Sequence, residues 1–467
     1  MTLRKILFWC HLAAGVTVGA VILIMSVTGV LLTYERQISW WADTRHYSIQ
    51  PPHPDAPRRS IESLIVGVHE AEPRSTFTTM TVRADPLAPV AFASADGTVY
   101  VNPYTGDVMG NGSPGTRRFF RAVTDWHRTL AFTGDRRPLG RAITGACNLA
   151  FLFIVSSGLW LWWPRAWTRR HVRSVTTFNA RLRGRARDFN WHNVVGFWSA
   201  IPLIVIVLGA SVISYPWATN MVYRLVGETP PTPQRPRQPA AGAARPDRAA
   251  SAGADNPRPL VDGIDALWTR AERQVVGWRI ISVRLSTAPD APVVFTIDQG
   301  TGGQPQKRGT LTLARSTADV LRWEPYSTLS PGRRLRVWLR FAHTGEVYGL
   351  AGQAVAGLAS LGGATLVVTG LMLAGRRLLA WRARAKTPSE LQSRRVPTRG
   401  WNGRRWILSD RRYLLEAAQV VRVDREGGGQ HLDRDLAPEA RVARAIDLAH
   451  APGAERRDNL VGPNSGS

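Results

Sequence analysis

Four long stretches of the sequence contain no aspartate, glutamate, lysine or arginine, at about residues 6–32, 142–163, 194–217 and 350–374. Each has about 20 residues or more, which is the length that an α-helix needs to cross a bilayer. We therefore interpret them as membrane spans rather than as buried helices of a soluble protein. The lack of carboxylates within them also argues against a metal-ion transporter, which usually places such groups there.

Cysteines and acidic residues are also scarce. The 467 residues include 2 cysteines, and 34 acidic side chains stand against 60 basic ones, for a net charge of +26. In a four-span topology, Cys10 lies near the cytoplasmic edge of its span and Cys147 lies nearer the outer edge of another. The two cysteines cannot reach each other, which excludes a disulfide framework. Nucleic-acid binding is one explanation of so basic a chain, but the placement of the charges favours membrane topology.

Arginine and lysine gather beside the spans. One cluster precedes the first span, one lies between the second and the third, and one follows the fourth. With four spans, all three clusters fall on the same side, and positive residues beside spans mark the cytoplasmic side. We therefore predict that both termini are cytoplasmic and that the two long segments between spans are external. The clusters are Arg4 and Lys5; Arg165, Arg169, Arg170, Arg173, Arg181, Arg183, Arg185 and Arg187; and Arg376, Arg377, Arg382 and Arg384.

The order of features in the first half repeats in the second. A His-x-x-x-Gly motif lies near the start of a span, Ser-Pro-Gly opens a basic stretch that ends near a histidine, Gly-x-Ala-x-x-Gly begins the next span, and Gly-Leu follows within it. We therefore predict an internal duplication in an α-helical integral membrane protein with four transmembrane helices and external α+β modules. In order, the features occupy residues 11–15, 113–115, 140–145 and 158–159 in the first half, and 192–196, 330–332, 352–357 and 370–371 in the second.

Hydropathy and periodicity divide the chain into segments. The external segments show helical spacing followed by alternation typical of strands, except in a stretch rich in proline, alanine and arginine that we expect to be disordered. The predicted segments are transmembrane helices at 1–35, 138–164, 190–217 and 349–376; external modules at 36–112 and 218–330, the second with a linker at 227–259; interfacial helices at 113–137 and 331–348; a basic cytoplasmic loop at 165–189; and a cytoplasmic tail at 377–467.

Two histidines at one depth on different helices can supply both axial ligands of a haem. By topology, one pair lies near the cytoplasmic face and one near the outer face. Neutral imidazole is a good iron ligand, and a glycine one turn along the same helix face leaves room for the macrocycle. The predicted site residues are His11 and His192 for the inner pair, His127 and His343 for the outer pair, and Gly15 and Gly196 as haem packing positions.

A plainer explanation of these residues stays open. A single membrane histidine is more often a hydrogen-bonded packing residue, and glycines four residues apart, such as Gly15 and Gly19, are more often a helix-contact motif. The outer pair is the more open case, because its histidines lie in interfacial stretches rather than in spans. The arginines beside that pair could anchor lipid phosphates, or hold haem propionates or an anionic substrate.

The strand–turn–strand pattern around Thr105-Gly106 resembles the closing hairpin of a PepSY domain. Together with the motifs around His11, His127, His192 and His343, it makes about residues 1–380 resemble the PepSY-associated transmembrane family. That family includes iron-regulated membrane proteins and ferri-siderophore reductases that hold two b-type haems. The resemblance implies two haem b groups at these histidines, and electron transfer across the bacterial inner membrane that reduces a ferric siderophore or another ferric chelate outside.

The resemblance leaves the donor of the electrons open. Some relatives carry a fused flavin reductase domain, whereas this chain has no glycine-rich dinucleotide fingerprint after a strand. The expected partners are therefore the lipid bilayer, an unidentified cytoplasmic or membrane electron donor and an anionic ferric chelate, without nucleic acid and with a homodimer left open. No catalytic residue is assigned. A hypothesis of another class is a non-enzymatic PepSY membrane anchor or regulator that binds an external protein.

Overall fold

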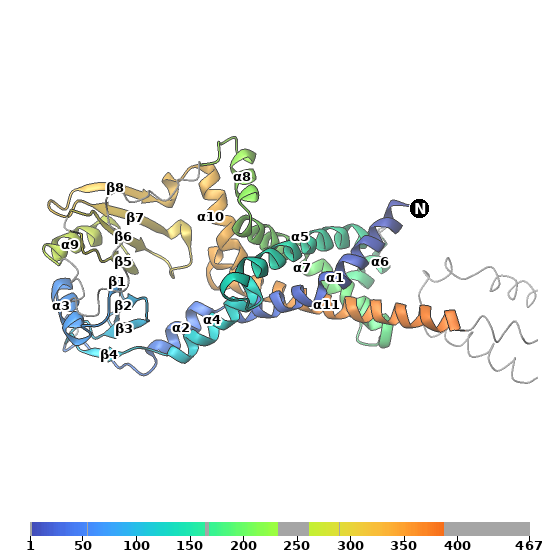
Figure 1. Ribbon diagram of the computed structural model, residues 1–467, viewed down its shortest axis with the longest axis horizontal. Helices are drawn as coiled ribbons and strands as arrows, with labels where there is room; N and C mark the ends of the chain where they lie inside the picture. Colours follow the sequence, from blue (N-terminus) through green and yellow to red (C-terminus); the bar gives the residue numbers. More distant parts are fainter. Residues whose placement is uncertain (1, 54, 164–167, 232–260, 289, 387–467) are drawn as a thin grey trace, which may run out of the picture. The chain divides into compact units, whose positions relative to one another are not determined.

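The structure of the chain is a computed structural model, and it describes residues 2–53, 55–163, 168–231, 261–288 and 290–386. The predicted linker lies outside the described residues from residue 232 on, and so does the predicted tail from residue 387 on. The described residues form a bundle of long helices and an antiparallel sheet with two helices against it (Figure 1).

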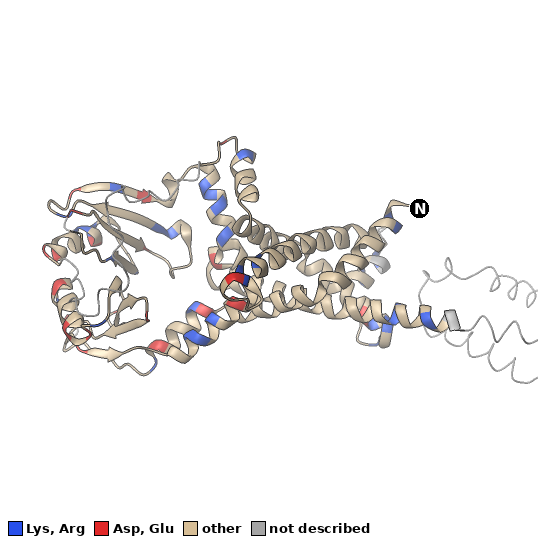
Figure 2. Ribbon diagram, in the orientation of Figure 1, with Lys and Arg blue, Asp and Glu red and all other residues tan. Residues whose placement is uncertain are grey.

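Four helices in the described part of the chain are long and apolar enough to cross a membrane. They are α1 (Leu3–Leu32), α5 (Arg137–Trp162), α7 (Gly184–Ser214) and α11 (Gly349–Lys386). Helices α1 and α7 each pack against both α5 and α11, so α1 lies diagonally across from α7. The middle of the bundle is free of charged side chains, which gather towards its ends (Figure 2).

Small residues bring these helices close together. A Cβ added to Gly357 of α11 would lie 3.0 Å from Thr33 Oγ1 at the end of α1, and one added to Gly362 would lie 3.0 Å from Ser199 Cβ of α7. Asn148 of α5 donates a hydrogen bond to the carbonyl oxygen of Val207 in α7 (3.1 Å). Close approach and interhelical hydrogen bonds are the interactions that hold helices together in lipid, where the hydrophobic effect does not act between them.

The two segments predicted to be external contribute to one eight-stranded antiparallel sheet with the order β4-β3-β2-β1-β5-β6-β7-β8. Strands β1 and β5 join the two segments: Thr81 lies opposite Ser282, and their hydroxyls are hydrogen-bonded at 2.8 Å. The pairing of β1 with β5 joins the strands of the two predicted modules into one sheet and covers two strands that would otherwise be exposed edges. The strands are β1 (Phe77–Arg83), β2 (Val90–Ser94), β3 (Thr98–Val101), β4 (Val108–Gly110), β5 (Ile280–Arg284), β6 (Val293–Asp298), β7 (Arg308–Leu313) and β8 (Val320–Pro325).

Two helices cover one face of this sheet, α3 (Ile61–Ala71) and α9 (Ile264–Gln274) (Figure 1). Leu64 of α3 and Leu267 of α9 are buried with Phe92 and Phe295 in a single core. Asp265 accepts hydrogen bonds at the N-terminus of α3 from the amides of residues 61 and 62, at 2.7 and 3.2 Å. One carboxylate therefore ties the two helices together and satisfies free amides at a helix start.

Five shorter helices lie beside the spans, and they correct several predicted boundaries. The helix expected over 113–137 ends at Thr129, because Leu130 and Ala131 adopt positive φ angles of 52° and 58°. The helix expected over 331–348 ends at His343, just before Gly345 (φ 75°). The loop expected over 165–189 contains a helix and the start of α7. These helices are α2 (Glu35–Thr44), α4 (Pro114–Thr129), α6 (Arg169–Thr176), α8 (Pro216–Leu225) and α10 (Pro331–His343).

Candidate functional site

His11 and His192 line one cavity of about 660 Å³ among the four long helices. The cavity lies at the end of the bundle where α1 and α7 begin and where α5 and α11 end. Its volume falls within the range of about 300–1,000 Å³ that is typical of small-molecule and cofactor sites. The predicted packing glycines, Gly15 and Gly196, line the same cavity.

Each histidine of the inner pair is hydrogen-bonded to a neighbouring span through Nδ1. His11 Nδ1 lies 2.9 Å from Ser157 Oγ of α5, and His192 Nδ1 lies 2.9 Å from Thr369 Oγ1 of α11. These two hydroxyls were not among the predicted site residues. The signal that could have found them was present, since each hydroxyl residue immediately precedes a glycine that the repeat had already singled out.

Glycines shape the space around the inner pair. A Cβ added to Gly158 would lie 3.3 Å from His11 Cε1, and one added to Gly370 would lie 3.3 Å from His192 Cε1, so both imidazole rings lie directly against a glycine. A Cβ added to Gly15 would meet nothing within 4 Å, whereas one added to Gly196 would contact Leu366 Cδ2 at 3.5 Å. Gly15 therefore borders open space within the cavity.

The mouth of the cavity is basic. Arg4, Lys5, Arg185 and Arg377 line it, and its lining contains no acidic residue. Arg4 donates a hydrogen bond to the carbonyl oxygen of Leu161 at the end of α5 (2.5 Å), while Arg377 stacks over the rings of Phe8 and Trp9. This arrangement can receive anionic groups that project from the apolar interior of the cavity.

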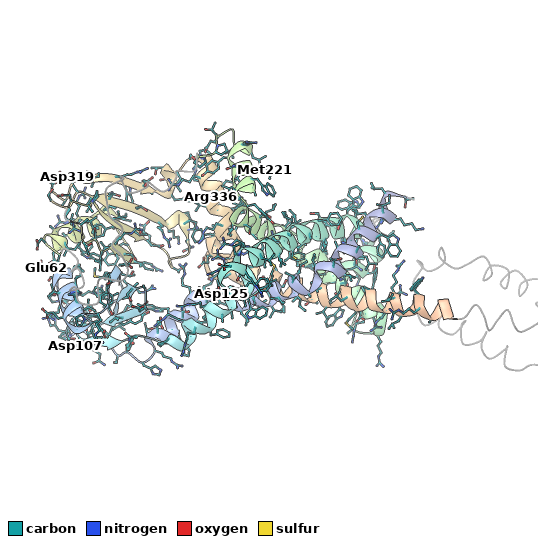
Figure 3. All side chains as sticks on the ribbon, in the orientation of Figure 1. Glu62, Asp107, Asp125, Met221, Asp319 and Arg336 are labelled. Carbon is teal, nitrogen blue, oxygen red and sulfur yellow. The ribbon has the colours of Figure 1, made fainter. Side chains whose placement is uncertain are left out.

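His127 and His343 meet at the other end of the bundle. They lie near the C-termini of α4 and α10, and their ring centroids are 6.2 Å apart with an angle of 53° between the planes. His127 Nδ1 lies 2.9 Å from Thr28 Oγ1 of α1, and His343 Nδ1 lies 2.8 Å from the carbonyl oxygen of Ile206 in α7. In Figure 3 the labels of Asp125 and Arg336 mark the helices that carry the two histidines.

The outer histidines are held in the neutral form. Burial, together with the nearby His343, lowers the pKa of His127 to about 4. Burial also lowers the pKa of His343. Both imidazoles therefore present a lone pair at neutral pH, as a metal ligand must.

Carboxylates, one buried and one partly exposed, fix the starts of the helices that carry this outer pair. Asp43 of α2 accepts hydrogen bonds from Tyr100 Oη (2.8 Å), from the amide of Ser113 (2.6 Å) and from Arg117 (2.7 Å). Glu228, which follows α8, accepts hydrogen bonds at the start of α10 from the hydroxyl of Ser330 (2.8 Å) and the amide of Gly332 (3.0 Å). Each carboxylate lies at a helix N-terminus, where negative charge is stabilising.

The four predicted histidines thus form two pairs, one near each end of the bundle. From His11 to Thr28, which contacts His127, α1 runs for 17 residues, about 25 Å at 1.5 Å per residue. Among the residues that the structure describes, no group of three or more His, Cys, Asp or Glu side chains could hold a metal ion.

The fold and the site define a class, a membrane protein built on four apolar helices, with one histidine pair on two of these helices and a second pair on two shorter helices beside them. The sequence matches the model of the PepSY-associated TM region over residues 8–377, and the chain belongs to this family. This confirms the family that the sequence motifs predicted. No curated protein matches the chain significantly.

Replacing Asp43 tests the anchor of α4. We expect Asp43→Ala to destabilise the protein by about 3 kcal/mol, because it removes the carboxylate that pairs with the partly buried Arg117 and accepts from the buried hydroxyl of Tyr100. Thermal unfolding of the purified protein in detergent measures the effect. Asp107→Ala, at an exposed position in the same segment, is the control and should leave the melting temperature unchanged. Equal melting temperatures for the two variants would contradict the anchoring role.

Proposed function

We propose that this protein is a haem-containing electron-transfer protein of the bacterial inner membrane that reduces a ferric siderophore or another anionic ferric chelate on the periplasmic side. One observation carries the proposal. The inner histidines line one cavity, the rings of the outer histidines lie 6.2 Å apart, and all four residues have their Nδ1 atoms hydrogen-bonded. Within the described chain no hydrogen bond engages their Nε2 atoms, which leaves these nitrogens available as axial ligands.

The residues of the inner site fit a haem b. His11 and His192 stand on helices that lie diagonally across the bundle, so their rings approach the cavity from opposite sides. Gly15 leaves space beside His11, and the remaining walls are mostly apolar. The basic mouth suits the two propionates, which would pair with Lys5 and Arg185 or with their neighbours.

The residues of the outer site fit a second haem b by the separation of their rings. A metal held about 2 Å from each of two imidazole nitrogens places the ring centres roughly 6 Å apart. The centroids of His127 and His343 are 6.2 Å apart. Their neutral form at neutral pH suits the same role.

A haem bound at each pair supplies a carrier that takes up and releases one electron. The residues of the chain would hold the two carriers at different depths, and an apolar layer between the pairs would keep water out. Ile22, Phe151, Leu203 and Ala359 are buried in that apolar layer, one from each long helix. Electrons from a cytoplasmic or membrane donor would enter at the inner pair and leave at the outer pair.

The orientation follows from the charges. The basic mouth at the inner pair lies on the cytoplasmic side if positive residues mark that side, and both termini are then cytoplasmic. The sheet then lies in the periplasm and is made of two PepSY-like modules. We propose that an internal duplication produced both modules and both halves of the bundle. The equivalent contacts of His11 with α5 and of His192 with α11 support it.

The visible spectrum of the purified protein, with haem counted per chain, tests the proposal directly. We expect two low-spin b-type haems per chain, one fewer in His11→Ala or His192→Ala, and one fewer in His127→Ala or His343→Ala, since each pair needs both ligands. His46→Ala, at an exposed position, is the control and should keep two. A folded protein from haem-supplemented cells that is colourless would contradict the proposal and favour the membrane anchor or regulator.

A substitution at Gly15 separates haem binding from folding. The longer side chain in Gly15→Leu would extend into the cavity, where an added Cβ meets no other protein atom within 4 Å. We therefore expect a protein that folds and keeps the outer haem but loses the inner one. Gly375→Leu is the matched control, because Gly375 also has open space around it but does not line the cavity. An unchanged haem count in Gly15→Leu would place the haem elsewhere.

Re-oxidation of the reduced protein tests the reductase activity. We expect ferric citrate, as an anionic ferric chelate, to re-oxidise the reduced haem signal and to yield ferrous iron that a ferrous-specific chelator captures. The gallium complex of the same chelator is the control, because gallium has the charge and size of ferric iron but is not reduced. Equal rates with the two metals would contradict reduction of the chelate, whatever the haem count.

A further inference from the structure

We propose that three pairs of adjacent residues, Ser157–Gly158, Thr369–Gly370 and Thr28–Gly29, are positioning residues that fix the tautomer and the ring orientation of His11, His192 and His127. The inference rests on the proposed function for its redox consequence, but its structural core does not need a haem. In all three cases a hydroxyl on a neighbouring span lies 2.9 Å from the histidine Nδ1.

Each hydroxyl has a backbone carbonyl that can accept its own proton. Ser157 donates to the carbonyl oxygen of Ile154 (3.1 Å), Thr369 to that of Thr365 (2.7 Å) and Thr28 to that of Ile24 (2.6 Å). A hydroxyl has one proton to donate and two lone pairs to accept with. When the hydroxyl donates to this carbonyl, its oxygen accepts from the histidine, and the imidazole proton then lies on Nδ1 and the free lone pair on Nε2.

At Gly158 and Gly370 the glycine limits the ring in a second direction, whereas at Gly29 the contact is an ordinary van der Waals one. An added Cβ would lie 3.3 Å from the histidine Cε1 at Gly158 and at Gly370, and 3.7 Å at Gly29. The first two distances are tighter than ordinary van der Waals contact, so an alanine would push the ring away from the helix. At His11 and His192, the hydrogen bond and the close glycine together set the rotation of the ring, and therefore the direction in which Nε2 points.

The fourth histidine reaches the same state by another route. His343 Nδ1 donates to the carbonyl oxygen of Ile206 (2.8 Å), and a Cβ added to Gly209 of the same helix would lie 2.9 Å from His343 Cβ. The acceptor here belongs to the backbone, and no side-chain substitution can remove it. All four histidines thus present Nε2, although one does so without a hydroxyl.

The acceptor also tunes a bound metal. A histidine that donates from Nδ1 is a more basic ligand, which favours the oxidised metal. Removing the hydroxyl acceptor therefore raises the reduction potential of the haem that this histidine holds. A tenfold change in the one-electron equilibrium corresponds to about 59 mV.

Substitution of Thr369 tests the inference. Thr369→Val removes the acceptor at almost constant volume, and Thr369→Ser retains it. Thr365→Val is the matched control, since Thr365 lies one turn away on α11 and its hydroxyl bonds only to the carbonyl oxygen of Leu361. We expect Thr369→Val to raise the midpoint potential of the inner haem by roughly 60 mV, or to lower its occupancy about tenfold, and we expect Thr369→Ser and Thr365→Val to resemble the wild type.

Nitrogen-15 NMR of selectively labelled histidine in haem-free protein gives a readout that needs no cofactor. We expect the signal of His192, assigned from His192→Ala, to report a neutral ring protonated at Nδ1, and to lose this preference in Thr369→Val. Protonation at Nε2 in the wild type would overturn the inference. The inference would also be overturned if the wild type binds haem and Thr369→Val has the same midpoint potential and the same haem occupancy as the wild type. A wild type without haem, but with Nδ1 protonated, would refute the proposed function and leave the positioning role standing.

Discussion

A bilayer interior offers no water to a polar side chain, so an imidazole placed there must find its partner on another helix. His11 and His192 meet this requirement with hydroxyls on α5 and α11, which ties each of the two diagonal helices to a neighbour. Because Nδ1 is occupied by that bond, Nε2 is directed towards the space between the helices. The position of the cavity, and its suitability for a ligand that bridges two imidazoles, both depend on this constraint.

At the other end of the bundle, carboxylates add to the hydroxyl of Thr28 and the carbonyl of Ile206 that bond the two imidazoles. Asp43 and Glu228 hold the N-termini of α4 and α10, whose C-terminal ends carry His127 and His343. Asp43 also accepts from Tyr100 of β3, so one carboxylate connects the sheet to the helix that carries a predicted ligand. The outer pair is thus carried by two short helices that are anchored at their N-termini, and not by the long helices themselves.

Much of this arrangement was predictable from local patterns. The absence of charge located the four spans, alternation predicted strands in both segments that form the sheet, and the repeated motifs located all four histidines. The features that the sequence did not reveal depend on partners far along the chain. The pairing of β1 with β5 is one, and the contact of His192 with Thr369 is another. The left-handed residues Leu130 and Ala131, which end α4, give no signal in hydropathy or periodicity.

The central claim is that each histidine pair encloses a haem, and a cryo-electron microscopy map of the protein purified from haem-sufficient cells tests it most directly. We expect a flat density between His11 and His192 and another between His127 and His343, each joined to both Nε2 atoms. A map in which the four imidazoles are well resolved, with lipid or side chains filling the space between them, would contradict the claim.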